Sequence, residues 1–218
     1  MADYKKIGFI GTGIMGGQMC RNLAMKIGVP VIAFDMDMNK VTALGDFGVE
    51  AAPSIAAVVE ASDIILMCLP GEPQVRSVCT QKGGILEHVR PGQTIIDLTT
   101  ATADVEREME KFFAEKSADY ADAPVARGAS SAEDGTLSIM VGATTEVFER
   151  IRPILDTMGT EITLCGDVGT GQVVKLMNNM ILVMNVSALE EALAIGARAG
   201  VDGELLFKTL SCSSADSF

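Results

Sequence analysis

The stretch Lys6-Ile-Gly-Phe-Ile-Gly-Thr-Gly-Ile-Met-Gly16 decides the fold of this chain. Its first part, Lys6–Gly11, is short and apolar and reads as a buried strand. Its second part fits the pattern G-x-G-x-x-G and runs into a helical pattern over Met15–Ile27. The pattern alone is weak evidence, but between a strand and a helix it is typical of a turn that holds a dinucleotide.

Each glycine of this turn has a separate task in such a site. Gly11 permits the tight turn, Gly13 lets the backbone approach a pyrophosphate, and Gly16 lets helix and strand pack closely. The first amides of the helix have no partners within it and can bind phosphates. We therefore predict a cofactor site at the residues Gly11, Thr12, Gly13, Ile14 and Met15. A glycine-rich turn without a ligand is the alternative.

Asp35 and Met36 follow the second predicted strand and are assigned to the same site. A carboxylate there accepts hydrogen bonds from the adenosine ribose and repels the 2′-phosphate of NADP. No arginine stands in Met36–Asn39, so NAD is predicted and NADP is less favoured. In the alternative reading, Asp35 or Asp37 only caps the next helix. Lys40 could still reach a phosphate.

Strands and helices alternate along the first three-quarters of the chain. This alternation predicts an α/β fold, a Rossmann-type doubly wound and mainly parallel sheet. The expected strands are Lys6–Gly11, Val31–Phe34, Ile64–Leu69, Thr94–Leu98, Tyr120–Ala123, Leu137–Val141 and Glu161–Cys165, and the expected helices include Met15–Ile27, Ala103–Lys116 and Thr144–Met158.

The pattern changes at the glycine-rich joint Gly166–Gly171. One long helical pattern follows over Gln172–Ala199, and Asp202 is placed to cap another helix that ends near Leu210. We predict a NAD-binding Rossmann domain over residues 1–165 and the start of an all-helical substrate and dimerisation domain over 166–218. That second region is small for a core of its own. We expect it to be truncated, or to be completed by another subunit.

Two further strand ends carry candidate cofactor contacts, because ligands of open α/β sheets bind at the carboxyl ends of strands. Leu69 and Pro70 are predicted on the adenine side, and Thr99 and Thr100 at the nicotinamide ribose. Each pair can also be read as a strand end followed by a helix cap.

The candidate catalytic and substrate-binding residues lie in the second half of the chain. Lys175 stands near the start of the long helix, and Asn178 and Asn179 share its helix face. An amine whose pKa is lowered by burial can act as a general acid or base at a substrate oxygen. In the loop Asp122–Gly128, Arg127 offers a guanidinium fork to an anionic group. On spacing alone, a lysine and an arginine in such positions are more often solvated surface residues.

Composition excludes several classes of function. A formal net charge of -12 argues against nucleic acid and anionic membranes as partners. The polar residues within Val173–Ile195 argue against a transmembrane span. Five cysteines without a C-x-x-C pair and the single His88 predict no metal site and no disulfide framework. The expected compartment is reducing, and the default location is the cytoplasm.

Four ordered motifs resemble those of the β-hydroxyacid dehydrogenases. They are the run Phe9–Leu23, the loop Asp122–Val125, the tripeptide Gly135–Leu137 and the segment Gly171–Asn179. The resemblance covers essentially the whole chain. It implies a NAD(P)-dependent oxidoreductase that moves a hydride between nicotinamide and a short, anionic 3-hydroxyacid or its semialdehyde, and a homo-oligomer that forms through the helical domain.

The resemblance also implies the roles of single residues. Lys175 corresponds to the catalytic lysine, and Asn179, with Asn178 beside it, to a residue that holds the substrate. The loop Val125, Ala126, Arg127 and Gly128 corresponds to the segment that contacts the acid group of the substrate.

Two departures from the family pattern matter. The usual Ser-Gly-Gly after Pro-Val is here Ala126-Arg127-Gly128, which resembles the loop of sulfolactaldehyde reductases and suggests a strongly anionic substrate tail. The chain also stops before the later Lys-Asp motif of the family's helical domain. The alternatives are a non-catalytic NAD-binding protein and an imine-reducing relative, against which Lys175 speaks.

Overall fold

The structure, a computed structural model, describes residues 4–215 and divides into two compact units. The first unit is Met1–Lys175 and the second is Leu176–Phe218. The division falls inside one long helix, α9 (Thr170–Arg198), three residues before the predicted substrate-binding pair Asn178 and Asn179 begins. Each unit is described by itself below.

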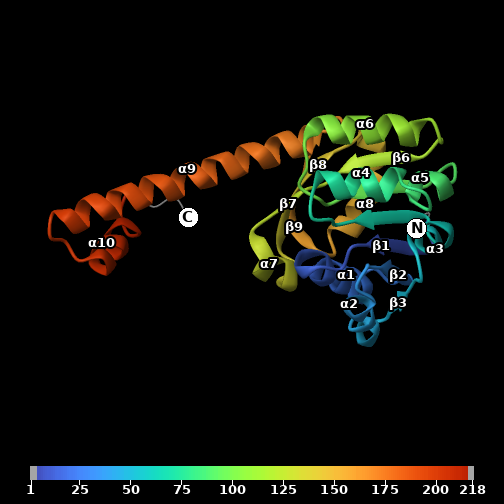
Figure 1. The fold of residues 1–218 in the computed structure, drawn as a ribbon, viewed down its shortest axis with the longest axis horizontal. Helices are drawn as coiled ribbons and strands as arrows, with labels where there is room; N and C mark the ends of the chain where they lie inside the picture. Colours follow the sequence, from blue (N-terminus) through green and yellow to red (C-terminus); the bar gives the residue numbers. More distant parts are fainter. Residues whose placement is uncertain (1–3, 216–218) are drawn as a thin grey trace. The chain divides into compact units, whose positions relative to one another are not determined.

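The first unit is built on a single nine-stranded sheet with the order β3-β2-β1-β4-β5-β6-β8-β7, and β9 pairs with β8 (Figure 1). All pairs from β3 to β6 are parallel, which confirms the predicted Rossmann-type, doubly wound fold. The strands are β1 (Ile7–Ile10), β2 (Val31–Phe34), β3 (Val49–Ala51), β4 (Ile64–Met67), β5 (Thr94–Asp97), β6 (Asp119–Asp122), β7 (Val125–Ala126), β8 (Leu137–Gly142) and β9 (Gly159–Gly166).

Helices cover both faces of this sheet and enclose two separate apolar cores. Successive strand residues point to opposite faces, so Leu66 packs in one core and its neighbour Met67 in the other. The first core includes residues of α1 and α8, and the second includes residues of α3, α4, α5 and α6. The helices of this unit are α1 (Ile14–Lys26), α2 (Met38–Thr42), α3 (Ile55–Ala61), α4 (Glu72–Thr80), α5 (Ile85–His88), α6 (Ala103–Ala114), α7 (Gly128–Asp134) and α8 (Thr145–Leu155), with a 3-10 turn at Gly45–Phe47.

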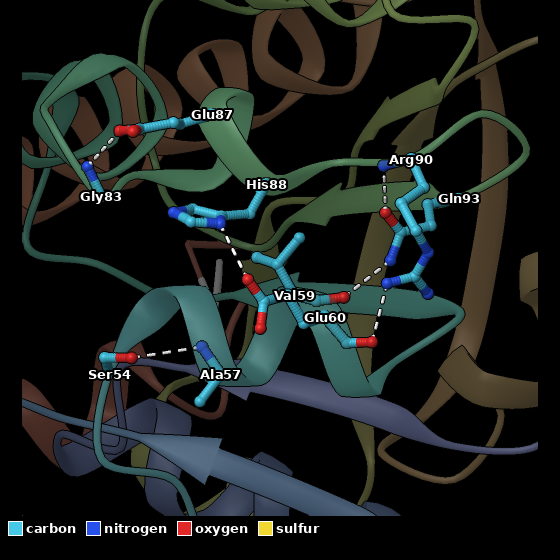
Figure 2. Close-up of polar contacts among 9 residues, drawn as sticks. All are labelled: Ser54, Ala57, Val59, Glu60, Gly83, Glu87, His88, Arg90 and Gln93. Carbon is cyan, nitrogen blue, oxygen red and sulfur yellow. Dashed lines mark hydrogen bonds and ion pairs between the residues drawn. The ribbon is translucent and has the colours of Figure 1, made fainter.

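The short helix α3 is held at both ends by side chains (Figure 2). At its start, Ser54 Oγ accepts the backbone N–H of Ala57 at 3.2 Å. At its end, Arg90 donates to the carbonyl of Glu60 at 2.7 Å and Gln93 donates to that of Val59 at 2.8 Å. Such bonds satisfy groups that a helix leaves unpaired at its termini. They fix α3 although it has only seven residues.

Strand β8 extends the sheet past the edge at which the parallel strands end. It pairs with β6 only through Asp122 and Gly142, the last residue of each strand, and it runs antiparallel. The start of β8 pairs instead with β7, in the register Ala126 with Ser138. The loop after β6 therefore lies beyond the carboxyl edge of the sheet, which is where ligands of this fold class bind.

The second unit contains the rest of α9 and α10 (Gly203–Leu210). Asp202 caps α10 as predicted, since its carboxylate accepts the backbone N–H of Leu205 at 2.9 Å. The two helices pack tightly, because a Cβ on Gly196 would lie 2.2 Å from Leu206 Cδ2. Of the predicted polar end Ser211–Phe218, residues 216–218 lie outside the described part of the chain.

Helix α9 is long and apolar enough to cross a membrane when judged by length and composition alone. The sequence-based argument that its polar residues rule out such a span is therefore not supported by this criterion. One helix of this kind is weak evidence for a membrane segment, because helices that pack in soluble proteins meet the same criterion.

Candidate functional site

The glycine turn between β1 and α1 has the shape that the sequence predicts. Gly11 has φ +91°, and a Cβ there would lie 2.3 Å from the carbonyl oxygen of Cys68. A Cβ on Gly16 would lie 2.0 Å from the carbonyl oxygen of Gly11. At Gly13, by contrast, a Cβ would meet no described atom within 4 Å. Gly11 and Gly16 are thus required by the protein itself, whereas the space at Gly13 is open for a ligand.

Thr12 provides an independent sign that this turn receives a polar group. Its backbone N–H donates to Asp35 Oδ2 at 2.7 Å. Its side-chain Oγ1 is buried, yet it has no hydrogen-bond partner among the residues that the structure describes. Buried hydroxyls nearly always have partners, so an unpaired one two residues before the start of α1 fits a site for phosphate oxygens, although Thr12 itself is not among the residues that line the cavity described below.

Asp35 joins the glycine turn to the end of β2. Its Oδ1 accepts the backbone N–H of Asp37 at 2.9 Å, and Lys40 Nζ lies 3.9 Å from the same oxygen. Each carboxylate oxygen has further acceptor capacity, so ribose hydroxyls can still bind there. Asp37 caps α2 by accepting the N–H of Asn39. The capping role therefore belongs to Asp37, and Asp35 faces the cavity beside the turn.

A cavity of about 930 Å³ opens in front of this turn. It accounts for most of the predicted cofactor residues, since its lining includes Gly11, Gly13, Ile14, Met15, Asp35, Met36, Leu69 and Pro70. The sequence did not predict the rest of the lining, which α3, α4 and the residues next to them supply with Pro53–Ala56, Gln74, Ser77, Val78 and Gln81–Gly83. A signal that could have found part of this lining is Ser54, a residue type that favours helix N-caps, directly before the apolar run of α3. The volume suits a ligand of dinucleotide size.

The predicted threonines do not line this cavity. Thr99 is buried, its Oγ1 accepts the backbone N–H of Leu69 at 3.0 Å, and its own N–H donates to Asp97 at 2.8 Å. Thr99 therefore ties the end of β5 to the loop after β4. Thr100 is exposed. Their contact with a nicotinamide ribose stays a prediction.

Asp122, at the end of β6, fixes the start of α9. Its Oδ1 accepts the N–H of Gly169 at 2.6 Å, and its Oδ2 accepts the N–H of Gln172 at 2.8 Å. Burial raises the pKa of Asp122 to about 6, although these two donors act against the shift. Glycines make room for the carboxylate, because a Cβ on Gly142 would lie 2.1 Å from Oδ1 and one on Gly171 would lie 2.7 Å from Oδ2.

Lys175 stands one turn beyond this cap and is half-buried. Its amine forms no ion pair with any residue that the structure describes, and burial lowers its pKa. A partly desolvated amine is better suited to exchange a proton near neutral pH than an exposed one. Asn178 and Asn179 follow on α9 in the second unit, where Asn178 Nδ2 donates to Asn179 Oδ1 at 3.3 Å.

The loop Val125–Gly128 begins in β7 and ends at the start of α7. Arg127 has φ +84°, the left-handed conformation that glycine adopts most easily. Its Nη1 donates to the carbonyl of Thr136 at 3.1 Å and to Thr160 Oγ1 at 3.3 Å. The guanidinium thus already binds the first residues of the β8 and β9 region, and its remaining N–H groups are the ones left for an anion.

Comparison with known protein families divides the chain in two. Residues 6–166 match the family described as the NAD binding domain of 6-phosphogluconate dehydrogenase. Residues 169–218 match the family described as NAD-binding of NADP-dependent 3-hydroxyisobutyrate dehydrogenase. The two descriptions name both forms of the cofactor, so they do not decide between NAD and NADP.

Similar curated proteins are hydroxyacid dehydrogenases. The chain is 42% identical over 213 residues to 2-(hydroxymethyl)glutarate dehydrogenase of Eubacterium barkeri, covering 98% of this chain and 70% of that protein. It is 37% identical over 214 residues to mitochondrial 3-hydroxyisobutyrate dehydrogenase of Mus musculus, covering 98% of this chain and 64% of that protein. The chain thus spans about two thirds of the length of these relatives.

Among solved structures, 3-hydroxyisobutyrate dehydrogenase of Mycobacterium tuberculosis, studied with L-serine, is similar with a TM-score of 0.89 and 30% identity. The match covers 98% of this chain and 72% of that one. The fold, the motifs and the sequence similarity therefore all indicate a hydroxyacid dehydrogenase.

Proposed function

This chain belongs to the β-hydroxyacid dehydrogenase family, and on that premise we propose that it is a NAD(P)-dependent oxidoreductase of short 3-hydroxyacids or their semialdehydes. One observation carries the proposal. The first unit combines a glycine turn facing a cavity of about 930 Å³ with a half-buried amine, Lys175, on the first turns of α9. A binding protein without catalysis has no need of that amine.

Different residues of the chain are proposed to bind the cofactor and to transfer the proton. The backbone of the turn Gly11–Met15 would hold the pyrophosphate, Asp35 a ribose, and Leu69 with Pro70 the adenine side. When bound, a nicotinamide dinucleotide supplies the acceptor or donor for hydride. Lys175 in its neutral form takes the hydroxyl proton of the substrate during oxidation, and in its charged form returns a proton to the carbonyl oxygen during reduction.

NAD is the cofactor we propose. Its support is Asp35, whose carboxylate lies beside the turn and would repel a 2′-phosphate. Lys40, with its amine 3.9 Å from Asp35 Oδ1, neutralises part of that charge and leaves some tolerance for NADP.

The substrate is proposed to carry a strong anionic tail, such as the sulfonate of sulfolactaldehyde. The support is the guanidinium of Arg127 at the tip of the loop Val125–Gly128, where Ala126 replaces the usual serine hydroxyl. We propose that Asn179, with Asn178 beside it, orients the substrate, as the family resemblance implies.

The direct test measures turnover by the Lys175→Ala variant of the 218-residue chain. We expect it to bind NAD with unchanged affinity and to lose turnover by a factor of about 10² or more, because general acid–base catalysis contributes that much. Lys111→Ala, which removes an exposed lysine of α6, is the matched control and is expected to behave as the wild type. Wild-type rates in Lys175→Ala would refute the mechanism. Binding of NAD without turnover of any semialdehyde by the wild type would favour a non-catalytic protein.

A substrate panel tests the finer proposal. It should contain sulfolactaldehyde, methylmalonate semialdehyde and tartronate semialdehyde, each with NADH and NADPH. We expect Arg127→Ala to slow the substrate with the strongest anionic tail by about tenfold more than the others, as loss of a charge-assisted hydrogen bond predicts. Equal slowing of every substrate would contradict a specific role for Arg127.

A homo-oligomer and a cytoplasmic location are also proposed. The first is supported by the apolar side chains that α9 leaves exposed, among them Val173, Met177, Ile181 and Val183. The second is supported by the five free thiols. Light scattering of the purified chain and fractionation of cells test the two proposals separately.

A further inference from the structure

A chain of hydrogen bonds lies beneath the start of α9, inside the first unit. Its centre is Glu106 of α6, whose side chain is completely buried. The hydroxyl of Tyr120 lies 2.7 Å from Glu106 Oε2, and Gln172 Nε2 donates to Glu106 Oε1 at 2.8 Å. A carboxyl in the apolar layer between helix and sheet is costly unless it is bound on every side.

Gln172 connects this carboxyl to the end of β5. Its Nε2 also donates to the carbonyl of Thr99 at 2.7 Å, and its Oε1 accepts the backbone N–H of Ala101 at 3.1 Å. All the polar atoms of this amide are therefore engaged. Gln172 stands three residues before Lys175 on the same helix, so fixing its side chain fixes the rotation of the turn that carries the amine.

The hydrogen-bond geometry around Tyr120 requires a proton on one of the two carboxyls beside it. Tyr120 has one hydroxyl hydrogen, but its oxygen lies beside two carboxyls, at 2.7 Å from Glu106 Oε2 and at 3.4 Å from Asp97 Oδ2. Both contacts are hydrogen bonds only if one carboxyl is protonated. Hydrogen bonds from Thr99 oppose the rise in the pKa of Asp97, which burial raises only to about 7, whereas burial raises the pKa of Glu106 to about 10. The proton therefore belongs on Glu106, which donates to Tyr120, and Tyr120 donates to Asp97.

The surroundings of Glu106 support the neutral state. Burial raises its pKa above the ordinary range of a carboxyl, and the negative charge of Asp97 adds to the shift. The groups that face it are Asp97 of β5, Tyr120 and Asp122 of β6, Cys79 of α4 and the amide of Gln172. Burial also raises the pKa values of Tyr120 and Cys79, so both are neutral as well. Among the described residues no cation forms an ion pair with Glu106, and the charge of Arg107, its neighbour on α6, acts on Asp122.

We propose that Glu106 is a positioning residue whose protonated carboxyl holds Gln172 and thereby sets the orientation of Lys175. The proposal rests on the proposed function, because orientation matters only if Lys175 exchanges a proton with a substrate. It distinguishes replacements that can form the same hydrogen bonds from replacements that cannot. A glutamine at this position can donate to Tyr120 and accept from Gln172, as the protonated acid does. A leucine of similar size can do neither.

The test compares the wild-type chain with Glu106→Gln and Glu106→Leu. The infrared spectrum of the wild type is expected to show the carbonyl stretch of a protonated carboxyl at neutral pH that is missing in Glu106→Gln. Turnover by Glu106→Gln should stay within about twofold of the wild type, while kcat of Glu106→Leu should fall by about tenfold or more, since small displacements of a catalytic group cost that much. The KM for NAD should be unchanged in both, because the cofactor cavity does not include these residues.

A measurement that needs no turnover separates this proposal from the proposed function. The pH dependence of acylation of Lys175 by an amine reagent, read by peptide mass spectrometry, reports the surroundings of the amine. It should be the same in Glu106→Gln as in the wild type and shift toward that of an exposed lysine in Glu106→Leu. The proposal is overturned if no protonated carboxyl is lost in Glu106→Gln, or if turnover by that variant falls about tenfold or more below that of the wild type. These two readings decide it even if Glu106→Leu does not fold.

Discussion

The carboxylate of Asp122 accepts the backbone N–H of Gln172 at 2.8 Å, so the end of β6 caps a helix that begins far along the chain. A carboxylate near a helix N-terminus is stabilised by the unpaired amides and the helix dipole. Here the cap connects the sheet to α9. It therefore also fixes the position of the helical turn that carries Lys175. The close fit of glycines around this carboxylate makes it testable.

We expect Gly171→Ala to destabilise the first unit by about 1–3 kcal/mol, the usual range for an overpacked site. The added Cβ would lie 2.3 Å from the carbonyl oxygen of Met140 and 2.7 Å from Asp122 Oδ2. Urea unfolding measures the effect. Gly45→Ala is the matched control, because a Cβ there meets no described atom within 4 Å. Equal stability of the two variants would contradict the described packing.

Gly13→Ala should separate folding from cofactor binding. A Cβ at this position meets no described atom within 4 Å, so the free energy of unfolding without ligand should change by less than about 0.5–1 kcal/mol, the intrinsic Gly-to-Ala effect. The same methyl group would stand where a pyrophosphate approaches, and the Kd for NAD should rise by about tenfold or more, equivalent to about 1.4 kcal/mol. Calorimetric titration with NAD checks this. Unchanged affinity would show that the dinucleotide does not bind against this turn.

Cofactor preference should depend on Asp35. Asp35→Asn keeps the size of the side chain and removes the charge, so the ratio of kcat/KM for NAD to that for NADP should fall by about tenfold, or about 1.4 kcal/mol. Lys40→Met is expected to move the ratio the other way, because it removes the cation 3.9 Å from Asp35 Oδ1. Initial rates with the two cofactors give both ratios. A ratio that does not respond to Asp35→Asn would remove the main support for NAD.

The buried acid Glu106 predicts how stability depends on pH. Its folded pKa is raised by burial, so above about pH 4.3, the ordinary value for Glu, the folded chain keeps a proton that the unfolded chain releases. The free energy of unfolding therefore falls as the pH rises, by up to about 1.4 kcal/mol per pH unit for one proton. Glu106→Gln lacks this proton, and its curve between pH 5 and pH 8, measured by urea unfolding, should be flatter by up to that amount (about 1.4 kcal/mol per unit). Parallel curves would mean that Glu106 is ionised.

The backbone at Arg127 predicts a stability difference between two truncations. Its φ of +84° costs a non-glycine residue about 1 kcal/mol, which glycine does not lose. Arg127→Gly and Arg127→Ala both remove the bonds to Thr136 and Thr160, so their difference isolates the backbone. We expect the glycine variant to be the more stable by about 1 kcal/mol. A more stable alanine variant would contradict this conformation.

The sequence predicts those elements of the fold whose pattern extends over several consecutive residues. The strands β1, β4 and β5 were predicted because apolar runs bounded by turns are typical of strands buried on both faces. The strands Val49–Ala51 and Val125–Ala126 were missed, since two or three residues show no periodicity. The glycine turn was predicted in full, because its residues are adjacent in the chain.

The rest of the site depends on contacts between distant segments. Thr99 reads equally well as a ligand contact or as a partner of Leu69, and only the fold decides that its hydroxyl accepts that N–H. Glu106 lies in a charged helical pattern and would be read as exposed. It is buried because Tyr120 and Gln172 lie close to it in space, although Gln172 is 66 residues away in the chain.

Strands β3 and β9 both lie at edges of the sheet, and they differ in how readily another chain could pair with them. Strand β3 has only three residues, too few to recruit a neighbouring chain. Strand β9 has eight, but its register with β8 shifts twice, at Leu137/Ser138 and at Val141/Gly142. Irregular edges of this kind are poor templates for intermolecular strands. The first unit should therefore resist edge-to-edge aggregation during folding even when its concentration is high.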